Sequence, residues 1–303
     1  MTDLARVSVP ASCANLGPGY DVLGLALGLR LSATAQLAPE WKITTLGAGA
    51  QQLPTTGDNL VARAYGRVCR RRGWSMGPLE VKVDNPIPIG RGLGSSAAAI
   101  VTGMALAQLL HQGRLDRDEL FREAAAMEGH PDNVAPAVYG GLQRVNTQAS
   151  AVTASAQELA GNVKVLLVIP HAGKSTARMR EVVPEEIAPL VQAANDESLR
   201  HVLEGLAKGD PKGLRYSAED RRHQPYRLAV QPESAAIFEL LQQNEHVAGV
   251  FLSGAGTAIG GWVVGKIDPT EQVRQAVEAR LLSASVRLVN PDRLGVQGEI
   301  FDG

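Results

Sequence analysis

The stretch at residues 85–99, NPIPIGRGLGSSAAA, constrains the fold of this chain more than any other. Before it, the alternation of apolar and polar residues at 79–83 predicts a strand. After it, the long apolar run 97–110 predicts a helix that is buried on most sides. The chain must therefore pass from a strand into a helix through a short loop in which every second residue is glycine.

This loop is suited to binding an anion. Glycines at alternate positions allow positive φ angles and let main-chain N–H groups converge without Cβ atoms in the way. Ser95 or Ser96 is expected to cap the helix, whose N-terminus is the positive end of its dipole. Phosphate is the anion that this arrangement favours, although the same pattern also occurs in turns that are only tightly packed.

Two common phosphate loops are excluded by the spacing. No lysine follows the glycines as in G-x-x-x-x-G-K-[ST], and the pattern G-x-G-x-G-S differs from the G-x-G-x-x-G of dinucleotide-binding folds. Whatever this loop binds, the sequence predicts that backbone groups and serine hydroxyls make most of the contacts.

The composition is that of a globular protein with a sizeable core. The 303 residues suggest two domains or one large one, and the net charge of −1 does not indicate a nucleic acid or an anionic membrane as partner. Cys13 and Cys69 are too few and too far apart for a disulfide framework or a metal site. No signal-peptide pattern or membrane-spanning run is recognised, so we expect a cytoplasmic location.

A second polar cluster, EGHPDN at 128–133, follows a predicted helix over 117–128. Glu128 would lie at the C-terminal end of that helix, where the dipole disfavours a carboxylate and a bound cation would offset the cost. Gly129 and Pro131 are expected to keep the following turn out of a helix. An Asx-type turn with a surface histidine explains the cluster equally well.

Three other segments shape the expected organisation. The polar, aperiodic stretch 147–162 is the candidate domain boundary, and the basic, aromatic stretch 221–227 is expected to interrupt the helices around it. Asn15 and Asp21 lie in a turn near the N-terminus, where the simplest interpretation is that they hold the turn together. The second half alternates helices and strands, which indicates an α+β sandwich.

Three motifs, in this order, resemble those of the GHMP kinase family: PASCANLGPGYDVLG, PIPIGRGLGSSAAA and FLSGAGTA. The resemblance covers about residues 7–264, with one departure: Thr257 stands where family members usually carry proline. It implies an α+β, two-domain fold, with an N-terminal α/β nucleotide-binding domain at 1–155 and a C-terminal ferredoxin-like α/β sandwich at 156–303.

Within this family, the stretches EGHPDNVAPA, STARMR and HQPYR are most similar to the branch that phosphorylates homoserine. The resemblance implies transfer of the γ-phosphoryl group of ATP to the hydroxyl of L-homoserine with Mg²⁺, on the route to threonine, and a homodimer. The alternatives are a family member that acts on another small alcohol, such as mevalonate or a sugar, and a relative that binds without catalysis.

The resemblance also implies roles for individual residues. The segment that cradles the phosphates of ATP comprises Pro88, Ile89, Gly90, Arg91, Gly92, Leu93, Gly94, Ser95, Ser96, Ala97 and Ala98. The Mg²⁺ ligands are Ser96 and Glu128. The residues that contact homoserine are Asn15, Asp21, His130, Asn133, Thr176, Arg180 and Arg227. Of these, the two arginines bind the carboxylate, which suits a guanidinium, and Asp21 binds the ammonium group.

The base is the role left open. Asp132 resembles the aspartate that serves as a base elsewhere in the family. Alternatively, and this is the scheme favoured here, Asn133 only positions the hydroxyl of the substrate, and the proton of that hydroxyl passes to the phosphate. Both schemes are compatible with the loose transition state of phosphoryl transfer, which requires little activation of the nucleophile.

Overall fold

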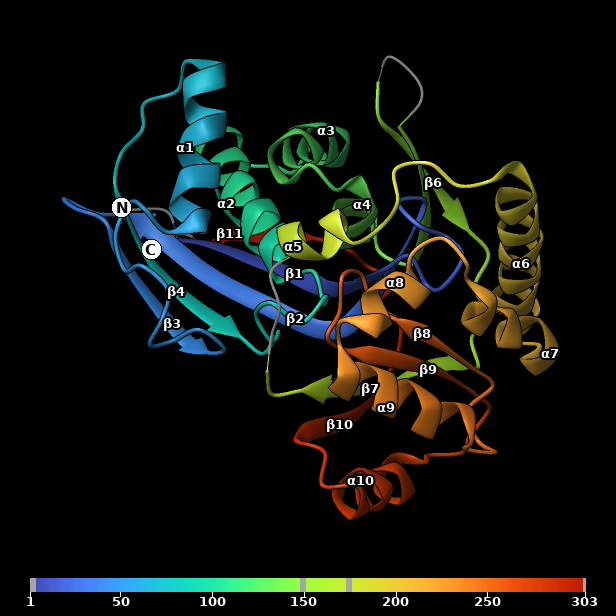
Figure 1. Cartoon of the computed structure of the whole chain (residues 1–303). Coiled ribbons are helices and arrows are strands. Elements are labelled where there is room, and N and C mark those ends of the chain that lie inside the picture. Colours follow the sequence, from blue (N-terminus) through green and yellow to red (C-terminus); the bar gives the residue numbers. More distant parts are fainter. Residues whose placement is uncertain (1–3, 148–150, 173–175, 302–303) are drawn as a thin grey trace.

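The computed structural model describes residues 4–147, 151–172 and 176–301, which form two sheets with helices on them (Figure 1). The first sheet has the strand order β11-β1-β2-β4-β3, and β5 pairs with both β2 and β6. Its strands are β1 (Leu4–Ala14), β2 (Leu23–Leu37), β3 (Lys42–Gly47), β4 (Leu79–Asn85), β5 (Leu142–Asn146), β6 (Thr153–Gln157) and β11 (Gln297–Phe301). Within it, β3 and β4 are parallel, and the other pairs are antiparallel.

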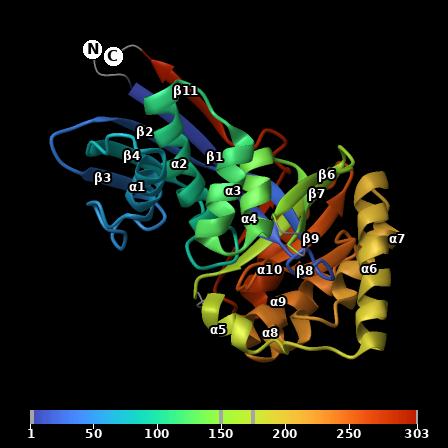
Figure 2. The same ribbon diagram turned by 90° about the horizontal axis from the view of Figure 1, so that it is seen from above.

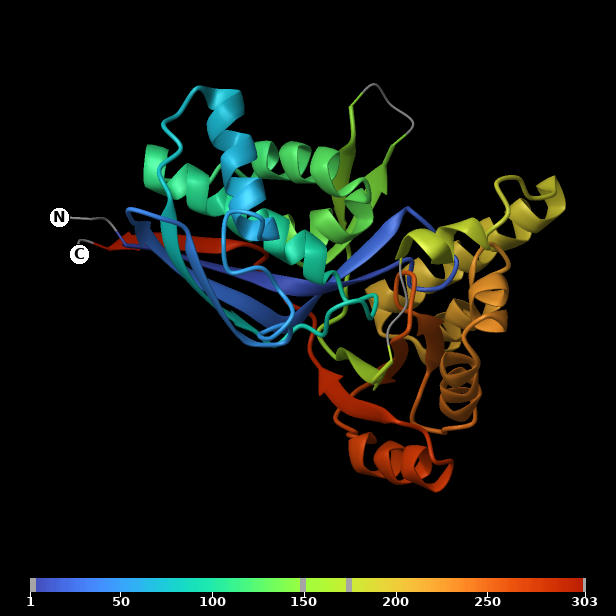
Figure 3. The same cartoon turned by 60° about the vertical axis from the view of Figure 1, so that its left-hand side comes forward.

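Four helices cover one face of this sheet (Figure 3). They are α1 (Leu60–Arg72), α2 (Ser95–Gln112), α3 (Arg117–Glu128) and α4 (Pro131–Tyr139). The apolar run that predicted a central helix is α2, which is buried along most of its length and packs against α1, α3 and β1. The glycine loop therefore emerges between the sheet and the helix layer.

The second sheet has the order β10-β7-β9-β8. Its strands are β7 (Val163–Pro170), β8 (Gly249–Leu252), β9 (Ile259–Val264) and β10 (Ala284–Val289), and two helices, α9 (Pro232–Gln242) and α10 (Thr270–Ala279), cover one face. Antiparallel strands with two crossing helices in this order form the ferredoxin-like arrangement that was expected. Along β7, Leu166 and Val168 face α9 and α10, whereas Val165 and Leu167 join the core of the first sheet.

The remaining helices connect β7 to α9. They are α5 (Thr176–Glu181), α6 (Pro189–Lys208), α7 (Pro211–Leu214), the 3₁₀ helix η1 (Arg215–Glu219) and α8 (Gln224–Ala229). Figure 2 shows α6 along the outer side of the molecule and α5 and α8 close to each other. None of the helices in the described ranges is long and apolar enough to cross a membrane.

Several local predictions were wrong. Neither serine caps α2, because its N-cap is Gly94 and no side chain accepts a hydrogen bond there. Pro131 does not keep its turn out of a helix but begins α4, since proline fits the first helical position. The stretch 147–162, which was expected to be aperiodic, contains β6, and most of 221–227 belongs to α8.

The end of the chain returns to the first sheet, where β11 pairs with β1. The first and last described residues, Leu4 and Phe301, are therefore paired with each other (Figure 1). The predicted division at residue 155 places β11 in the C-terminal domain, although β11 pairs with the first sheet. The division itself stays a prediction.

Candidate active site

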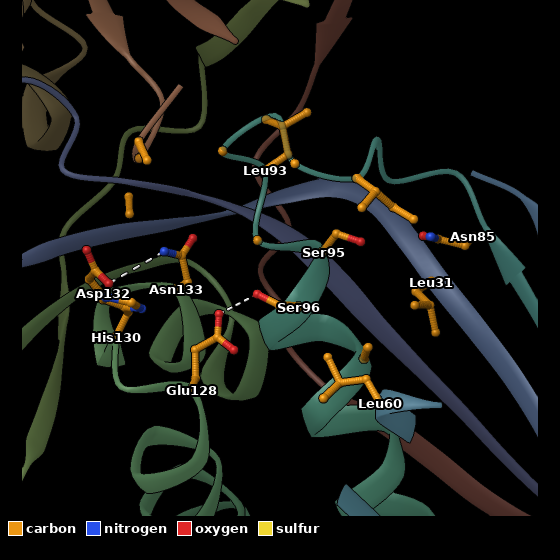
Figure 4. Close-up of a pocket in the computed structure, with 18 of the residues that line it drawn as sticks. Leu31, Leu60, Asn85, Leu93, Ser95, Ser96, Glu128, His130, Asp132 and Asn133 are labelled. Atoms are coloured by element: carbon orange, nitrogen blue, oxygen red, sulfur yellow. Dashed lines mark hydrogen bonds between the residues drawn. The ribbon is translucent and has the colours of Figure 1, made fainter. Parts of the chain in front are cut away.

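A cavity of about 300 Å³ opens between the glycine loop and the helices of the second half. Most of the residues that sequence reasoning singled out line it: Asn15, Asp21, Ile89, Gly90, Gly92, Leu93, Gly94, Ser95, Ser96, Glu128, His130, Asp132, Asn133, Arg180 and Arg227. Figure 4 shows part of this wall, with Ser95 and Ser96 at the start of α2.

The glycine loop joins the first and third motifs. The main-chain N–H of Ser12 donates to the carbonyl of Leu93 at 3.2 Å. The hydroxyl of Ser253 donates to the carbonyl of Gly92 at 2.7 Å. The N–H of Gly254 in turn donates to the carbonyl of Ala14 at 3.0 Å. Three motifs that are far apart in the sequence thus form one wall of the cavity.

Glycine is required in this loop for steric reasons. Gly92 has φ +74° and Gly94 has φ +66°. A Cβ atom on Gly92 would lie 2.0 Å from the carbonyl oxygen of Ser253, and one on Gly94 would lie 2.0 Å from Oγ of Ser12. Within the described part of the chain, no hydrogen bond comes from the main-chain N–H groups of residues 92–97. These N–H groups, at the positive end of α2, are therefore free for an anion.

Ser96 and Glu128 face each other across the cavity wall, and the Ser96 hydroxyl donates to Oε1 of Glu128 (Figure 4). Burial raises the pKa of the Glu128 carboxyl, which the hydrogen bond from Ser96 partly offsets. No salt bridge to Glu128 is found among the described residues. A half-buried carboxylate without a cationic partner, beside a hydroxyl, matches the hard oxygen ligands that Mg²⁺ prefers.

These two ligands would not hold a metal ion alone. Among the residues that the structure describes, no three side chains of His, Cys, Asp or Glu gather in a metal-binding group. Mg²⁺ is usually held by one or two carboxylates together with water and substrate phosphates, so the pair fits an ion that arrives with a nucleotide.

The start of α4 carries Asp132 and Asn133, with His130 just before it (Figure 4). The side-chain amide oxygen of Asn133, Oδ1, accepts a hydrogen bond of 2.9 Å from the Ser12 hydroxyl. Asp132 is only 3% exposed. Burial, with a smaller contribution from the charge of Asp21, raises the pKa of Asp132 to about 7, although Arg180 acts in the opposite direction. Burial also lowers the pKa of His130, which favours its neutral form.

Asp21 and Arg180 form a two-pronged ion pair, with Nη2 at 2.8 Å from Oδ1 and Nη1 at 3.2 Å from Oδ2. Asn15 supports it: its side-chain oxygen accepts from the N–H of Asp21 at 3.0 Å, and its Nδ2 donates to the carbonyl of Gly254 at 3.1 Å. Asn15 therefore holds the turn together, as the simplest interpretation expected, and also lines the cavity.

Arg227 is nearly buried beside this pair, with 2% of its surface exposed. Its Nε donates to the carbonyl of Met179 at 3.0 Å, and Nη1 donates to the carbonyl of Gly254 at 2.9 Å. The ring of Tyr20, which sequence reasoning missed, lies within 6 Å of three guanidinium groups, those of Arg180, Arg222 and Arg227. Such cation–π contacts hold positive charges together that would otherwise repel one another.

Four residues of the predicted set do not line the cavity, and the side chain of a fifth lies outside the described part of the structure. Pro88, Arg91, Ala97 and Ala98 are outside the lining. The Arg91 side chain instead reaches the carbonyls of Pro170 and His171 and thereby ties the loop to the end of β7. Ala97 and Ala98 are buried in the core. Thr176 begins α5, but its side chain lies outside the described part of the structure.

The part of the cavity that lies beyond the glycine loop, away from Asp132, was not predicted. It is lined by four apolar side chains, a threonine and two asparagines: Leu31, Leu53, Leu60, Val83, Thr45, Asn59 and Asn85. In Figure 4, Leu31, Leu60 and Asn85 lie beyond Ser95, away from Asp132. The sequence signal was weak because apolar residues on β2 and β4 read as ordinary sheet core.

Thr257, the departure from the family pattern, makes a bond that proline could not. Its hydroxyl donates to the carbonyl of Ala172 at 2.9 Å, and its own carbonyl accepts from the hydroxyl of Ser234 at 2.9 Å. The third motif is thus held to the segment after β7 by a side chain.

Comparison with known proteins supports this arrangement. The family model for the N-terminal domain of GHMP kinases matches residues 59–141, and the model for their C-terminal domain matches residues 202–285. The homoserine kinase of Clavibacter michiganensis subsp. michiganensis is 40% identical over 84% of this chain and 81% of its own length. That of Thermus thermophilus is 40% identical over 85% of this chain and 86% of its own length.

The fold is also that of a solved relative. The crystal structure of homoserine kinase from Cytophaga hutchinsonii superposes with a TM-score of 0.86 over 98% of both chains, at 24% sequence identity.

Proposed function

This chain belongs to the homoserine kinases of the GHMP kinase family, and from this premise we propose that it transfers the γ-phosphoryl group of ATP to the hydroxyl of L-homoserine. The product is O-phospho-L-homoserine, on the route to threonine. The observation that carries the proposal is a single cavity with free N–H groups at one wall and Asp21, Arg180 and Arg227 at another.

The phosphates of ATP belong at the glycine loop. The main-chain N–H groups of residues 92–97 have no partner in the described part of the chain, and they lie at the positive end of α2. The apolar end around Leu31, Leu60 and Val83 offers a site for the flat purine base. Pro88, Arg91, Ala97 and Ala98 shape the loop from behind without lining the cavity.

Mg²⁺ is proposed to bind with the nucleotide at Ser96 and Glu128. When bound, it would neutralise charge on the phosphate oxygens. The carboxylate of Glu128 is the half-buried charge that such an ion would satisfy, and the Ser96 hydroxyl holds this carboxylate in place.

Homoserine is a zwitterion, and the far wall offers groups of both signs. Its carboxylate would bind Arg227 and Arg180, and its ammonium group would bind Asp21. Because Asp21 and Arg180 already pair with each other, a zwitterion can enter between them and replace both halves of the ion pair. A ligand with only one charge would leave one member of the pair unsatisfied.

The hydroxyl of homoserine would lie near the start of α4, with Asn15, His130, Asn133 and Thr176 as further contacts. We propose Asp132 as the base, because a carboxyl with a pKa of about 7 can be ionised at neutral pH and still accept a proton. Asn133, held by Ser12, orients the hydroxyl beside it.

The direct test is incubation with ATP, Mg²⁺ and one acceptor at a time: L-homoserine, mevalonate or galactose. We expect phosphate transfer to homoserine, detected as O-phosphohomoserine by mass spectrometry and ³¹P NMR. Turnover of mevalonate or galactose without turnover of homoserine would contradict the proposal. Omission of Mg²⁺ tests the proposed metal.

Two further expectations rest on the family alone. A homodimer is proposed, to be checked by sedimentation, and a cytoplasmic location is proposed, to be checked by cell fractionation. A sedimentation mass of about one chain would contradict the first.

A further inference from the structure

His223, the first residue of the stretch HQPYR, is fully buried directly before helix α8, and the family resemblance assigned it no role. Its two ring nitrogens have different partners. Nε2 lies 2.9 Å from the carbonyl oxygen of Gly17, and Nδ1 lies 3.2 Å from Nη1 of Arg227. A carbonyl can only accept and a guanidinium can only donate, so the proton must lie on Nε2 and the lone pair on Nδ1. The partners thus select one neutral tautomer.

The surroundings of the ring support this assignment. Asp220 accepts hydrogen bonds from the main-chain N–H groups of Arg222, His223 and Gln224, and its Oδ2 lies 3.5 Å from Nε2 of His223. Burial lowers the pKa of His223 by more than the negative charge of Asp220 raises it, and the positive charge of Arg227 acts in the same direction as burial. The ring of Tyr20 covers the histidine at 5.2 Å. A positive charge on the ring would place an N–H on Nδ1 against the N–H of Arg227.

The consequence for Arg227 is a fixed orientation. Its Nε–H is used by Met179, and the two hydrogens of Nη1 are used by His223 and Gly254. No hydrogen bond joins Nη2 to any residue in the described part of the chain, and Arg227 lines the cavity. The edge of the guanidinium that remains available to a ligand is therefore Nη2.

We propose that His223 is a positioning residue that, as the neutral Nε2–H tautomer, holds Arg227 so that Nη2 is presented to the carboxylate of the substrate. The inference rests on the proposed function, in which Arg227 binds that carboxylate. It adds a physical link from the first motif to the second half: the carbonyl of Gly17 fixes the tautomer, and the tautomer fixes the arginine.

Two substitutions separate the two ring nitrogens. His223→Asn can place an amide oxygen where Nδ1 stood and so keeps an acceptor for Arg227. His223→Gln can place an amide N–H where Nε2 stood and so keeps the bond to Gly17, but leaves Arg227 without its acceptor. We expect the KM for homoserine to rise about tenfold in His223→Gln and to change much less in His223→Asn, with the KM for ATP unchanged in both.

Two controls distinguish positioning from a structural role. The amino alcohol 3-aminopropan-1-ol is homoserine without its carboxylate, and its kcat/KM should be the same in wild type and His223→Gln. The double variant His223→Gln with Arg227→Met should have the KM for homoserine of Arg227→Met alone, because the histidine acts only through the arginine. Equal losses for both substrates, or additive losses in the double variant, would overturn the inference.

The tautomer can be measured without any assay. Long-range ¹H–¹⁵N NMR correlations of labelled protein distinguish an imidazole protonated on Nε2 from one protonated on Nδ1, and we expect the Nε2–H pattern for His223. The Nδ1–H or the doubly protonated pattern at neutral pH would refute the proposal even if the variants fail to fold. Wild-type turnover of homoserine is scored separately, so failure of the proposed function is recognised as such.

Discussion

Residues 90–96, at one end of the cavity, present main-chain N–H groups, whereas Asp21, Arg180 and Arg227, at the other end, present charged side chains. The first set, the loop end, is one continuous segment whose shape depends on glycine. The second set, the arginine end, comes from three segments that are held together by one ion pair, hydrogen bonds and the ring of Tyr20.

The difference reflects what each end has to recognise. Main-chain N–H groups at a helix N-terminus bind any phosphate in a fixed place and need no particular side chain. A zwitterion can be distinguished from other alcohols only by groups of both signs at a fixed separation, which side chains provide. Substitutions at the loop end should therefore weaken binding because an added side chain clashes with its neighbours. Substitutions at the arginine end should weaken binding because a charge is lost.

The largest effect is expected at Asp132, which lines the same cavity. Asp132→Asn should lower kcat by about 10²–10⁴-fold, the usual contribution of a positioned base. The wild-type kcat should increase as the pH rises through about 7, because Asp132 then loses its proton, and the variant should lack this increase. A kcat and a pH profile like those of wild type would instead support positioning by Asn133 alone.

The stability of the same variant gives an independent check. The pKa of Asp132 is raised from about 4 in the unfolded chain to about 7 in the folded protein, so the folded state holds this proton more tightly. The free energy of unfolding of wild type should therefore fall as the pH rises between these values, and Asp132→Asn should remove that part of the fall. Urea titrations at several pH values measure it.

Gly92→Ala tests the loop end. A left-handed φ and a Cβ atom 2.0 Å from the Ser253 carbonyl should together lower the free energy of unfolding by about 2–5 kcal/mol. The resulting shift of the loop should lower kcat/KM for ATP by about 100-fold.

Gly113→Ala is the matched control, at the other end of the same helix. Gly113 has φ +72°, but nothing lies within 4 Å of the position of its Cβ. The free energy of unfolding of this variant should fall by only about 1–2 kcal/mol, and its activity should be that of wild type. Equal losses in the two variants would mean that backbone conformation matters at Gly92 and that contact with the third motif does not.

Glu128→Gln should separate catalysis from stability. Loss of the carboxylate should lower kcat by about 10–100-fold and raise the Mg²⁺ concentration needed for half-maximal rate. Because burial raises the pKa of Glu128, its charge destabilises the folded protein without metal at neutral pH, and the variant should be more stable there than wild type. An unchanged Mg²⁺ requirement would remove Glu128 from the proposed ligands.

The smallest effect is expected at Arg180. The side chains of Arg180 and Asp21 are each more than a third exposed, so solvent screens the attraction between their charges. Arg180→Met should raise the KM for homoserine by only about three- to tenfold, less than Arg227→Met, because Arg227 is buried. The exposed Arg178 on the same helix provides a control, and Arg178→Met should behave as wild type. A larger effect at Arg180 than at Arg227 would reverse the ranking of the two arginines.

Much of this protein could be predicted locally. The predicted helix over 117–128 is present with the same bounds: the side chain of its N-cap, Asp116, accepts from the N–H of Glu119, and Gly129 is its C-cap. The passage from β4 through the glycine loop into α2 also agrees with the structure. These features depend on a few neighbouring residues, because caps, positive φ angles and apolar periodicity act over one or two turns of chain.

What tertiary structure alone decided is which side chains meet. Tyr20 lies in a stretch whose sequence indicates only a turn, yet its ring lies within 6 Å of three guanidinium groups. His223 lies in a stretch whose sequence indicates only a basic interruption between helices, yet its ring forms a hydrogen bond with the carbonyl of Gly17, 206 residues away. The sequence by itself therefore determined the loop, the motifs and the two halves. The partners of buried polar side chains were decided by the packing of distant segments, on which local patterns carry no information.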